Sequence, residues 1–370
     1  MNGNVIPFPG HLRSWNSEDA RPAAERALAL EPEERLAKAN DLGLEHPELL
    51  LAVCELLRRR METEPAVVRR EAEFFFRFLW SPSRDIGQLD ERDYFLGELA
   101  LAAGTASRIT FRREEAAHWF DRAEANFVLV QNSSAHIARL AYQRLALHLE
   151  ERKIEEVLEF APLWARTLGR LGLAEESLKC EFLQALALRE IGRVEDGIKV
   201  LLSIGERADR LGTRKLLAHA FNNLAQFYRV AGDQARALES AQKALPLLQQ
   251  LDNRMALAKL RWCVGDILRD QRKVPEAIDA YREALKVSEE IGLRGDVAAI
   301  HLVVADLLLD SDLQAQAEWE IRAALPIIEE EHMVPEGLAA FTLLRESLRR
   351  REVNHQALRD LHGYFREPAS

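Results

Sequence analysis

The chain has 370 residues, 48% of them hydrophobic and 30% charged, and a formal net charge of −10 at pH 7. This acidic balance disfavours general nucleic-acid binding, which needs a basic surface. No run of 18 apolar residues occurs and the first ten residues do not resemble a signal peptide, so we expect a cytoplasmic protein without a membrane helix. The three cysteines, Cys54, Cys180 and Cys263, are far apart, which predicts reduced and buried thiols.

The N-terminal quarter of the chain has an irregular pattern. We interpret residues 1–13 as a flexible arm and residues 14–90 as an irregular helical region. The segment from Phe74 to Trp80 is densely aromatic, and we expect it to pack against the regular array that follows; the alternative is a surface that binds a partner. Residues 81–90 are polar and disfavour a helix, so we place a boundary there.

The sequence of residues 91–330 repeats with a period of about 40 residues. Two series of alanines stand seven residues apart, and a third series of small residues stands twelve residues before the first: Ala237, Ala277 and Ala317; Ala244, Ala284 and Ala324; Ala225, Gly265 and Ala305. Two helices approach closely only where side chains at their crossing are small. The repeat therefore predicts a stack of about six helical hairpins.

Glycines and one aspartate divide the array at equal intervals. Gly192 and Gly232 stand one period apart, where the turns within two hairpins are expected. A second series with the same spacing stands between hairpins: Gly172, Gly212, Asp252 and Gly292. We expect helices to end at these positions. Residues 331–370 are less regular and are predicted to form a pair of capping helices.

Residues 221–245 resemble a tetratricopeptide repeat. The residues that carry the likeness are Leu224, Ala225 and Tyr228 in the expected first helix and Ala237 and Ala244 in the second. The usual period of that family is about 34 residues, and the longer period here is similar to the arrays of kinesin light chains and of bacterial peptide-sensing regulators. The resemblance implies an all-α, right-handed superhelical solenoid of hairpins without a sheet. It also implies that the first helix of each hairpin lines a concave groove, and that the array binds peptides on this face or holds another domain.

Known catalytic and cofactor motifs are missing from the sequence. It contains no glycine-rich phosphate loop, no zinc-protease motif and no nucleophile elbow, and its ten histidines form no metal-ligand spacing with cysteines. We therefore expect a protein that is not an enzyme and holds no cofactor and no metal.

Basic residues recur in the expected first helices. One series is Arg189, Arg229 and Arg269, and a second series, ten residues earlier, is Lys179, His219 and Lys259. Ten residues are close to three helical turns, so both series lie on one face. The remaining candidates for the groove are Asn222, Asn223 and Gln226 and, one repeat later, Trp262 and Asp266. Together these eleven residues are the predicted peptide-binding groove.

Two interpretations of the basic series stay open. The arginines can bind a ligand, which would then be an extended acidic segment or one with a free C-terminal carboxylate. They can instead pair within the array, and Glu190 and Asp270 are adjacent candidates for that pairing. The two asparagines disfavour a helix, but each offers a donor and an acceptor that suit the backbone of an extended peptide.

The sequence supports one leading hypothesis of function. We expect a cytoplasmic interaction scaffold or regulator that binds a peptide or protein segment in its groove, with no nucleic acid and no membrane as partner. The alternative is a self-assembling structural module that dimerises through the aromatic N-terminal region, so a homo-oligomer stays open. An enzyme on a helical scaffold is the least favoured hypothesis.

Overall fold

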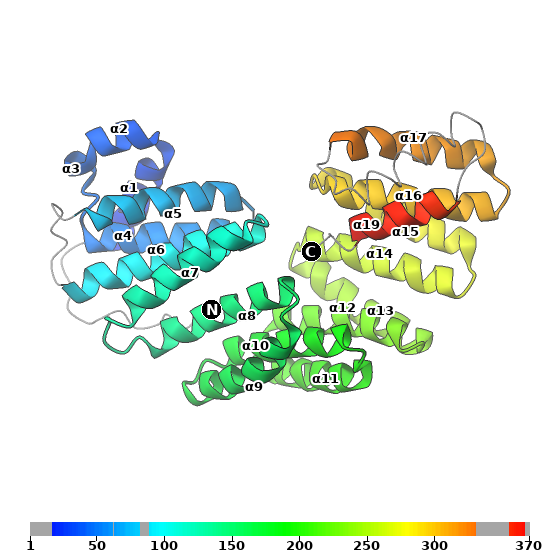
Figure 1. The fold of residues 1–370 in the computed structure, drawn as a ribbon, viewed down its shortest axis with the longest axis horizontal. Coiled ribbons are helices and arrows are strands. Elements are labelled where there is room, and N and C mark those ends of the chain that lie inside the picture. The colour runs from blue at the N-terminus through cyan, green and yellow to red at the C-terminus, as the bar shows by residue number, and fades with distance from the viewer. Residues whose placement is uncertain (1–16, 62, 82–88, 331–354, 367–370) are drawn as a thin grey trace. The chain divides into compact units, whose positions relative to one another are not determined.

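The computed structural model describes residues 17–61, 63–81, 89–330 and 355–366, and every regular element in these ranges is a helix. Consecutive helices pair as antiparallel hairpins joined by short turns (Figure 1). The chain divides into two compact units, residues 1–184 and 185–370, which are described separately. The predicted all-α array of hairpins is confirmed.

The first unit begins with short helices and ends with regular ones. They are α1 (Ser17–Ala29), α2 (Pro32–Ala37), α3 (Ala39–Leu42), α4 (Pro47–Arg60), α5 (Pro65–Trp80), α6 (Leu89–Ile109), α7 (Arg113–Phe127), α8 (Ser134–Glu150) and α9 (Ile154–Arg170). Helix α10 (Ala174–Glu190) carries the boundary between the units.

The aromatic segment at the end of α5 packs against the first regular hairpin. Phe75 and Phe76 are buried, and the ring of Phe76 lies 5.1 Å from the ring of Trp119 in α7. Trp80 remains 60% exposed. The expected packing of this segment onto the array is confirmed.

The second unit consists of helices of equal length and one further helix. They are α11 (Val194–Arg210), α12 (Arg214–Val230), α13 (Gln234–Gln250), α14 (Arg254–Asp270), α15 (Val274–Glu290), α16 (Arg294–Asp310), α17 (Gln314–Glu330) and α19 (His355–Arg366). From α8 to α17 every helix has 17 residues. Each of them begins half a period after the previous one, so residues one period apart occupy equivalent places in successive hairpins.

A left-handed residue follows each of the helices α8 to α16. Positive φ angles recur at every half period: Arg152, Gly172, Gly192, Gly212, Gly232, Asp252, Arg272, Gly292 and Asp312. The next N–H donates to the carbonyl five residues earlier, as from Arg193 to Leu188 at 2.8 Å, which closes the last turn. Glycine adopts this conformation at no steric cost. The helix ends predicted at glycines and at Asp252 are confirmed.

The small residues of the repeat lie where helices cross. The predicted alanines are all fully buried in the second unit, among them Ala277 and Ala305. A side chain on Gly265 would place its Cβ 2.7 Å from the ring of Tyr281. Glycine at this crossing therefore makes room for a large residue on the partner helix of the hairpin.

Several sequence expectations concern residues outside the described ranges. Residues 1–13, most of the boundary segment 81–90 and residues 331–354 belong to this group, so the predicted arm, boundary and first capping helix stay predictions.

None of the described helices has both the length and the apolar character needed to cross a membrane. Cys54, Cys180 and Cys263 are buried and free, as predicted. Burial raises the pKa of the thiols of Cys54 and Cys180 to about 12, which makes them poor nucleophiles.

Candidate functional site

Helix α12 presents the predicted groove residues as one stripe along its length. The stripe consists of His219, Asn222, Asn223, Gln226 and Arg229, and we call it the polar stripe. All its residues are half-buried except Asn222, which is 5% exposed. Helix α12 also contacts α14, so the first helices of these successive hairpins are direct neighbours.

The two asparagines of the polar stripe are held differently. Asn223 donates from Nδ2 to the carbonyl of His219 at 3.0 Å, one turn earlier in the helix. The Oδ1 atom of Asn222 is buried and accepts no hydrogen bond within the described part of the chain. A buried acceptor without a donor costs about 1–3 kcal/mol. Asn222 therefore keeps a buried acceptor that no donor among the described residues satisfies.

The arginine series pairs with carboxylates of the array. Nη1 of Arg229 lies 3.1 Å from Asp270 on the neighbouring first helix. Nη2 of Arg269 lies 3.6 Å from Asp266 and 3.7 Å from Asp270. Arg189 pairs with Glu190 at 3.2 Å.

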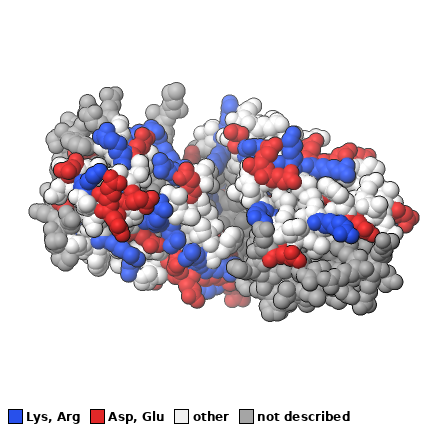
Figure 2. Space-filling view, turned by 90° about the horizontal axis from the view of Figure 1, so that it is seen from above, with Lys and Arg blue, Asp and Glu red and all other residues white. Residues whose placement is uncertain are grey.

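These pairs neutralise the basic series. Burial disfavours the charge of Arg229, but Asp266 and Asp270 outweigh burial and raise the pKa of its guanidinium above the usual value. The expected acids, Glu190 and Asp270, are confirmed as partners of arginines. Figure 2 shows basic and acidic side chains interspersed over the described part of the face that it draws.

Asp266 differs from its predicted role in the groove. Its side chain is completely buried, and its Oδ1 accepts a hydrogen bond from the hydroxyl of Tyr281 at 2.7 Å. Tyr281 belongs to the second helix of the same hairpin, so Asp266 stabilises the packing of α14 on α15. Its carboxylate is not exposed to a ligand, which corrects the sequence expectation for this residue.

The remaining predicted groove residues lie in unlike surroundings. Trp262 is 7% exposed, and its ring lies 6.1 Å from that of His362 in α19. Lys259 is exposed, and its charge acts on Asp296; burial of Asp296 outweighs that charge and raises the pKa of the carboxyl. Lys179 is half-buried and belongs to the first unit.

Helix α19 covers the stripe of α16 that corresponds to the polar stripe. The slots of Asn222 and Asn223 are occupied there by Leu302 and Val303, which are 0% and 3% exposed. Helix α19 lies beside α16 (Figure 1) and buries Leu358 and Leu361 in the same core. An ion pair of 3.2 Å joins Arg359 of α19 to Asp306 of α16. A helix from beyond the repeat therefore packs on this face of the array.

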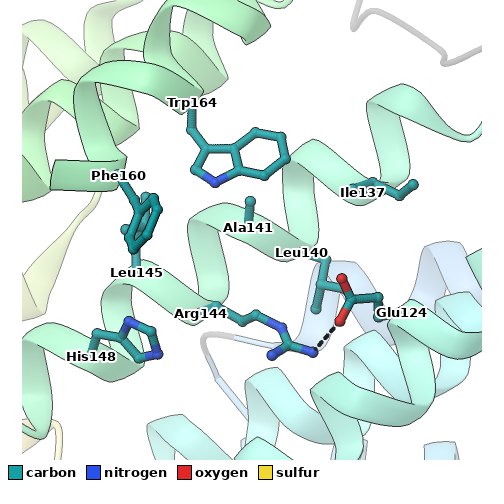
Figure 3. A pocket seen from close by; sticks show the side chains of 9 residues that line it. All are labelled: Glu124, Ile137, Leu140, Ala141, Arg144, Leu145, His148, Phe160 and Trp164. Carbon is teal, nitrogen blue, oxygen red and sulfur yellow. Dashed lines mark hydrogen bonds and ion pairs between the residues drawn. The ribbon is translucent and has the colours of Figure 1, made fainter. Parts of the chain in front are cut away.

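A hollow between α7, α8 and α9 was not predicted. Its volume is about 120 Å³, and Figure 3 shows the side chains around it: Glu124, Ile137, Leu140, Ala141, Arg144, Leu145, His148, Phe160 and Trp164. A signal for it exists in the sequence, because Trp164 stands at a slot of the repeat that alanine occupies in three later hairpins. Within the described ranges, no three side chains of His, Cys, Asp or Glu gather as metal ligands.

Comparison with known proteins finds similarity in fold. No protein-family model and no curated protein matches the sequence. A Rap protein complexed with competence and sporulation factor matches with a TM-score of 0.57 at 15% identity, covering 95% of this chain and 100% of that chain. The chain has the fold of the Rap proteins.

Two further Rap-like structures match over nearly the whole chain. The Rap conjugation gene regulator of the plasmid pLS20 in complex with the Phr* peptide matches with a TM-score of 0.58 at 13% identity, covering 95% of this chain and 94% of that chain. Aspartyl phosphate phosphatase F from Bacillus subtilis matches with a TM-score of 0.55 at 11% identity, covering 96% and 95%. The resemblance to bacterial peptide-sensing regulators is thereby confirmed at the level of fold.

Proposed function

We propose that this protein is an interaction module without catalytic activity that binds an extended peptide or protein segment along the polar stripe of α12. Two observations support the proposal. The fold is shared with Rap proteins whose solved structures contain competence and sporulation factor or the Phr* peptide. The polar stripe offers side-chain amides on a first helix, where an extended backbone can receive and donate hydrogen bonds.

The observation that carries the proposal is the state of Asn222. Its side chain is 5% exposed, yet its Oδ1 has no donor among the described residues. Asparagine in a helix interior disfavours the helix relative to leucine by a few tenths of a kcal/mol, and the unmet acceptor adds to that cost. A ligand backbone N–H would recover the loss once the amide turns toward the stripe's surface, because the oxygen itself is buried in the structure.

The arginines are already ion-paired within the array, which limits how much a ligand carboxylate can add to the binding free energy. A ligand carboxylate reaches Arg229 only by sharing its guanidinium with Asp270. We therefore expect amide contacts to set the position of the ligand, whereas an acidic residue or a C-terminal carboxylate adds a smaller, salt-dependent increment.

A selection experiment tests the proposal. A phage library of random heptapeptides is enriched in parallel on the wild-type chain and on Asn222→Leu, which carries the residue found at the equivalent slot of α16. Lys199→Ala is the matched control, because Lys199 is an exposed residue of α11 outside the polar stripe. We expect a sequence family that binds the wild type and the control but not Asn222→Leu. Equal enrichment on all three proteins, or none on the wild type, contradicts the proposal.

Self-assembly through the aromatic segment has less support from the described residues. Phe75, Phe76 and Leu79 are buried in the core of the first unit, and Trp80 is the aromatic residue of that segment that stays exposed. Mass measurement across a concentration range checks this alternative. A dimer that Trp80→Ser abolishes would favour it.

A further inference from the structure

The hairpin of α8 and α9 departs from the repeat at two slots. In later hairpins the first slot holds completely buried residues: Ile204, Ala244, Ala284 and Ala324. Trp164 occupies this slot in α9 and is only half-buried. The second slot holds Val200, Ser240, Ala280 and Glu320, which are buried or half-buried, whereas Phe160 at the same slot is 39% exposed.

These two aromatic residues border the hollow between α7, α8 and α9. An indole does not fit a close helix crossing that accepts alanine elsewhere. In Figure 3 the rings of Trp164 and Phe160 point from α9 toward Ala141 and Leu145 of α8. Ile137 and Leu140 complete an apolar lining that is open to solvent on one side.

The size of the hollow indicates what it can hold. Its volume of about 120 Å³ is close to the roughly 150 Å³ of an engineered cavity that binds benzene. Pockets for small-molecule ligands usually begin at about 300 Å³. The hollow therefore matches one aromatic or branched aliphatic side chain.

The rim of the hollow is acidic. Arg144 pairs with Asp121 at 2.9 Å and with Glu124 at 2.7 Å, so two carboxylates share one guanidinium. His148 lies 3.0 Å from Glu156, whose side chain is 48% exposed. Glu124 lines the hollow, and Asp121 and Glu156 are ion-paired with its lining residues Arg144 and His148. Three carboxylates thus stand against one permanent positive charge near the opening, and a basic group fits beside it.

We propose that this hollow binds a segment of a partner protein that inserts one apolar side chain, phenylalanine by preference, next to a lysine or arginine. The aromatic walls hold the inserted side chain, and the carboxylates of Asp121, Glu124 and Glu156 hold the neighbouring basic group. This site is separate from the polar stripe, and it does not depend on the proposed function of that stripe.

Fluorine NMR on the full-length chain labelled with 5-fluorotryptophan tests the proposal. The probes are three blocked dipeptides, Ac-Phe-Arg-NH2, Ac-Phe-Glu-NH2 and Ac-Ala-Arg-NH2, and Trp164→Phe assigns the resonance of Trp164. We expect Ac-Phe-Arg-NH2 to shift that resonance saturably. Exchange of arginine for glutamate should weaken binding about fivefold, which corresponds to the loss of one exposed ion pair. Exchange of phenylalanine for alanine should weaken binding about tenfold, because it removes the apolar side chain that fills the hollow. The resonance of Trp319, which is 64% exposed in α17, serves as control and should not move.

Two variants distinguish insertion of the phenylalanine side chain into the hollow from nonspecific binding of the dipeptide to the protein surface. Ala141→Leu fills the floor of the hollow, and Phe160→Ser removes one wall and introduces the residue type that α13 carries at this slot. Both should abolish the saturable shift while thermal unfolding shows a folded protein. The proposal is overturned if Ac-Phe-Arg-NH2 produces no saturable shift in the wild type, if Ac-Phe-Glu-NH2 binds equally well, or if Phe160→Ser binds like the wild type.

Discussion

Helices α12 and α16 occupy equivalent places in their hairpins but present opposite chemistry at the same slots. The polar stripe of α12 has His219, Asn222, Asn223, Gln226 and Arg229, whereas α16 has Ala299, Leu302, Val303, Asp306 and Leu309. Helix α19 packs on α16, where Ala299, Leu302 and Val303 are buried and Asp306 and Leu309 are half-buried. The stripe of α12 is half-buried except for Asn222. The repeat thus gives both helices the same backbone position. The side chains at the equivalent slots differ with what packs against each helix.

A covered face can also keep a charge, as α6 shows in the first unit. Glu98 is 4% exposed, and its carboxylate lies 2.8 Å from Arg139, 3.0 Å from His136 and 4.0 Å from Arg58. Burial opposes its ionisation, but Arg139, the hydrogen bond with His136 and Arg58 outweigh burial and lower the pKa of Glu98 to about 2. Here two arginines and a histidine surround a buried carboxylate, whereas α16 carries apolar residues at its buried slots.

The largest expected effect comes from placing the residue of α12 on the covered helix. Leu302→Asn should lower the free energy of unfolding by about 3–5 kcal/mol, because it removes a buried side chain and leaves an amide without partners beneath α19. Denaturant unfolding measures the loss. Leu302→Met keeps the volume and should cost less than about 1.5 kcal/mol. A mild effect of the asparagine would show that α19 does not seal this face.

The second-largest effect should come from acid, which weakens the ion pairs of Glu98. The pKa of Glu98 is lower in the folded state than its usual value of 4.5, so its pairing stabilises the fold above about pH 5 and is lost as the pH falls toward 2. The stability difference between the wild type and Glu98→Gln, measured by denaturant unfolding, should therefore shrink over this range. Glu159→Gln, at an exposed position of α9, should show no such trend. A difference independent of pH would refute the role of the carboxylate charge.

Reversing the charge of Arg229 should have an intermediate effect. Arg229→Glu loses the pair with Asp270 and adds a like charge beside Asp266, so we expect a loss of about 1–2 kcal/mol in thermal or denaturant unfolding. Arg229→Met retains the apolar stem and should cost less. Equal stability of Arg229→Glu and the wild type would show that the ion pair contributes nothing to the array.

The smallest effect on stability should come from the reciprocal exchange on α12. Asn222→Leu removes a buried acceptor that lacks a donor among the described residues, so the free energy of unfolding should stay within about 0.5 kcal/mol of the wild type or rise. The expected loss is in peptide binding, as measured by the selection described above. A strong destabilisation by Asn222→Leu would mean that the asparagine serves packing and not a ligand.

Much of this architecture follows from local sequence signals. The spacing of small residues predicts the helix crossings, and glycines and Asp252 predict the helix ends, because a left-handed turn and a close crossing each restrict residue type directly. Glu190 and Asp270 were also predictable as partners of Arg189 and Arg269, since they stand beside them in the sequence. The pair of Arg229 with Asp270 joins two helices and was not predictable from adjacency. The burial of Asp266 was not predictable from its own repeat, because it depends on a hydroxyl from Tyr281 that other hairpins lack at that slot.

The sequence by itself therefore determined the repeat, the hairpins and the places where helices begin and end, because these depend on neighbours along the chain and on a period that repeats. Only the tertiary structure decided which stripe is covered, which charges are paired and where a hollow opens. Helix α19 comes from beyond the repeat and buries α16, and Trp164 creates a hollow only through its fit against α8. Such outcomes depend on contacts between residues distant in sequence, which no periodicity encodes.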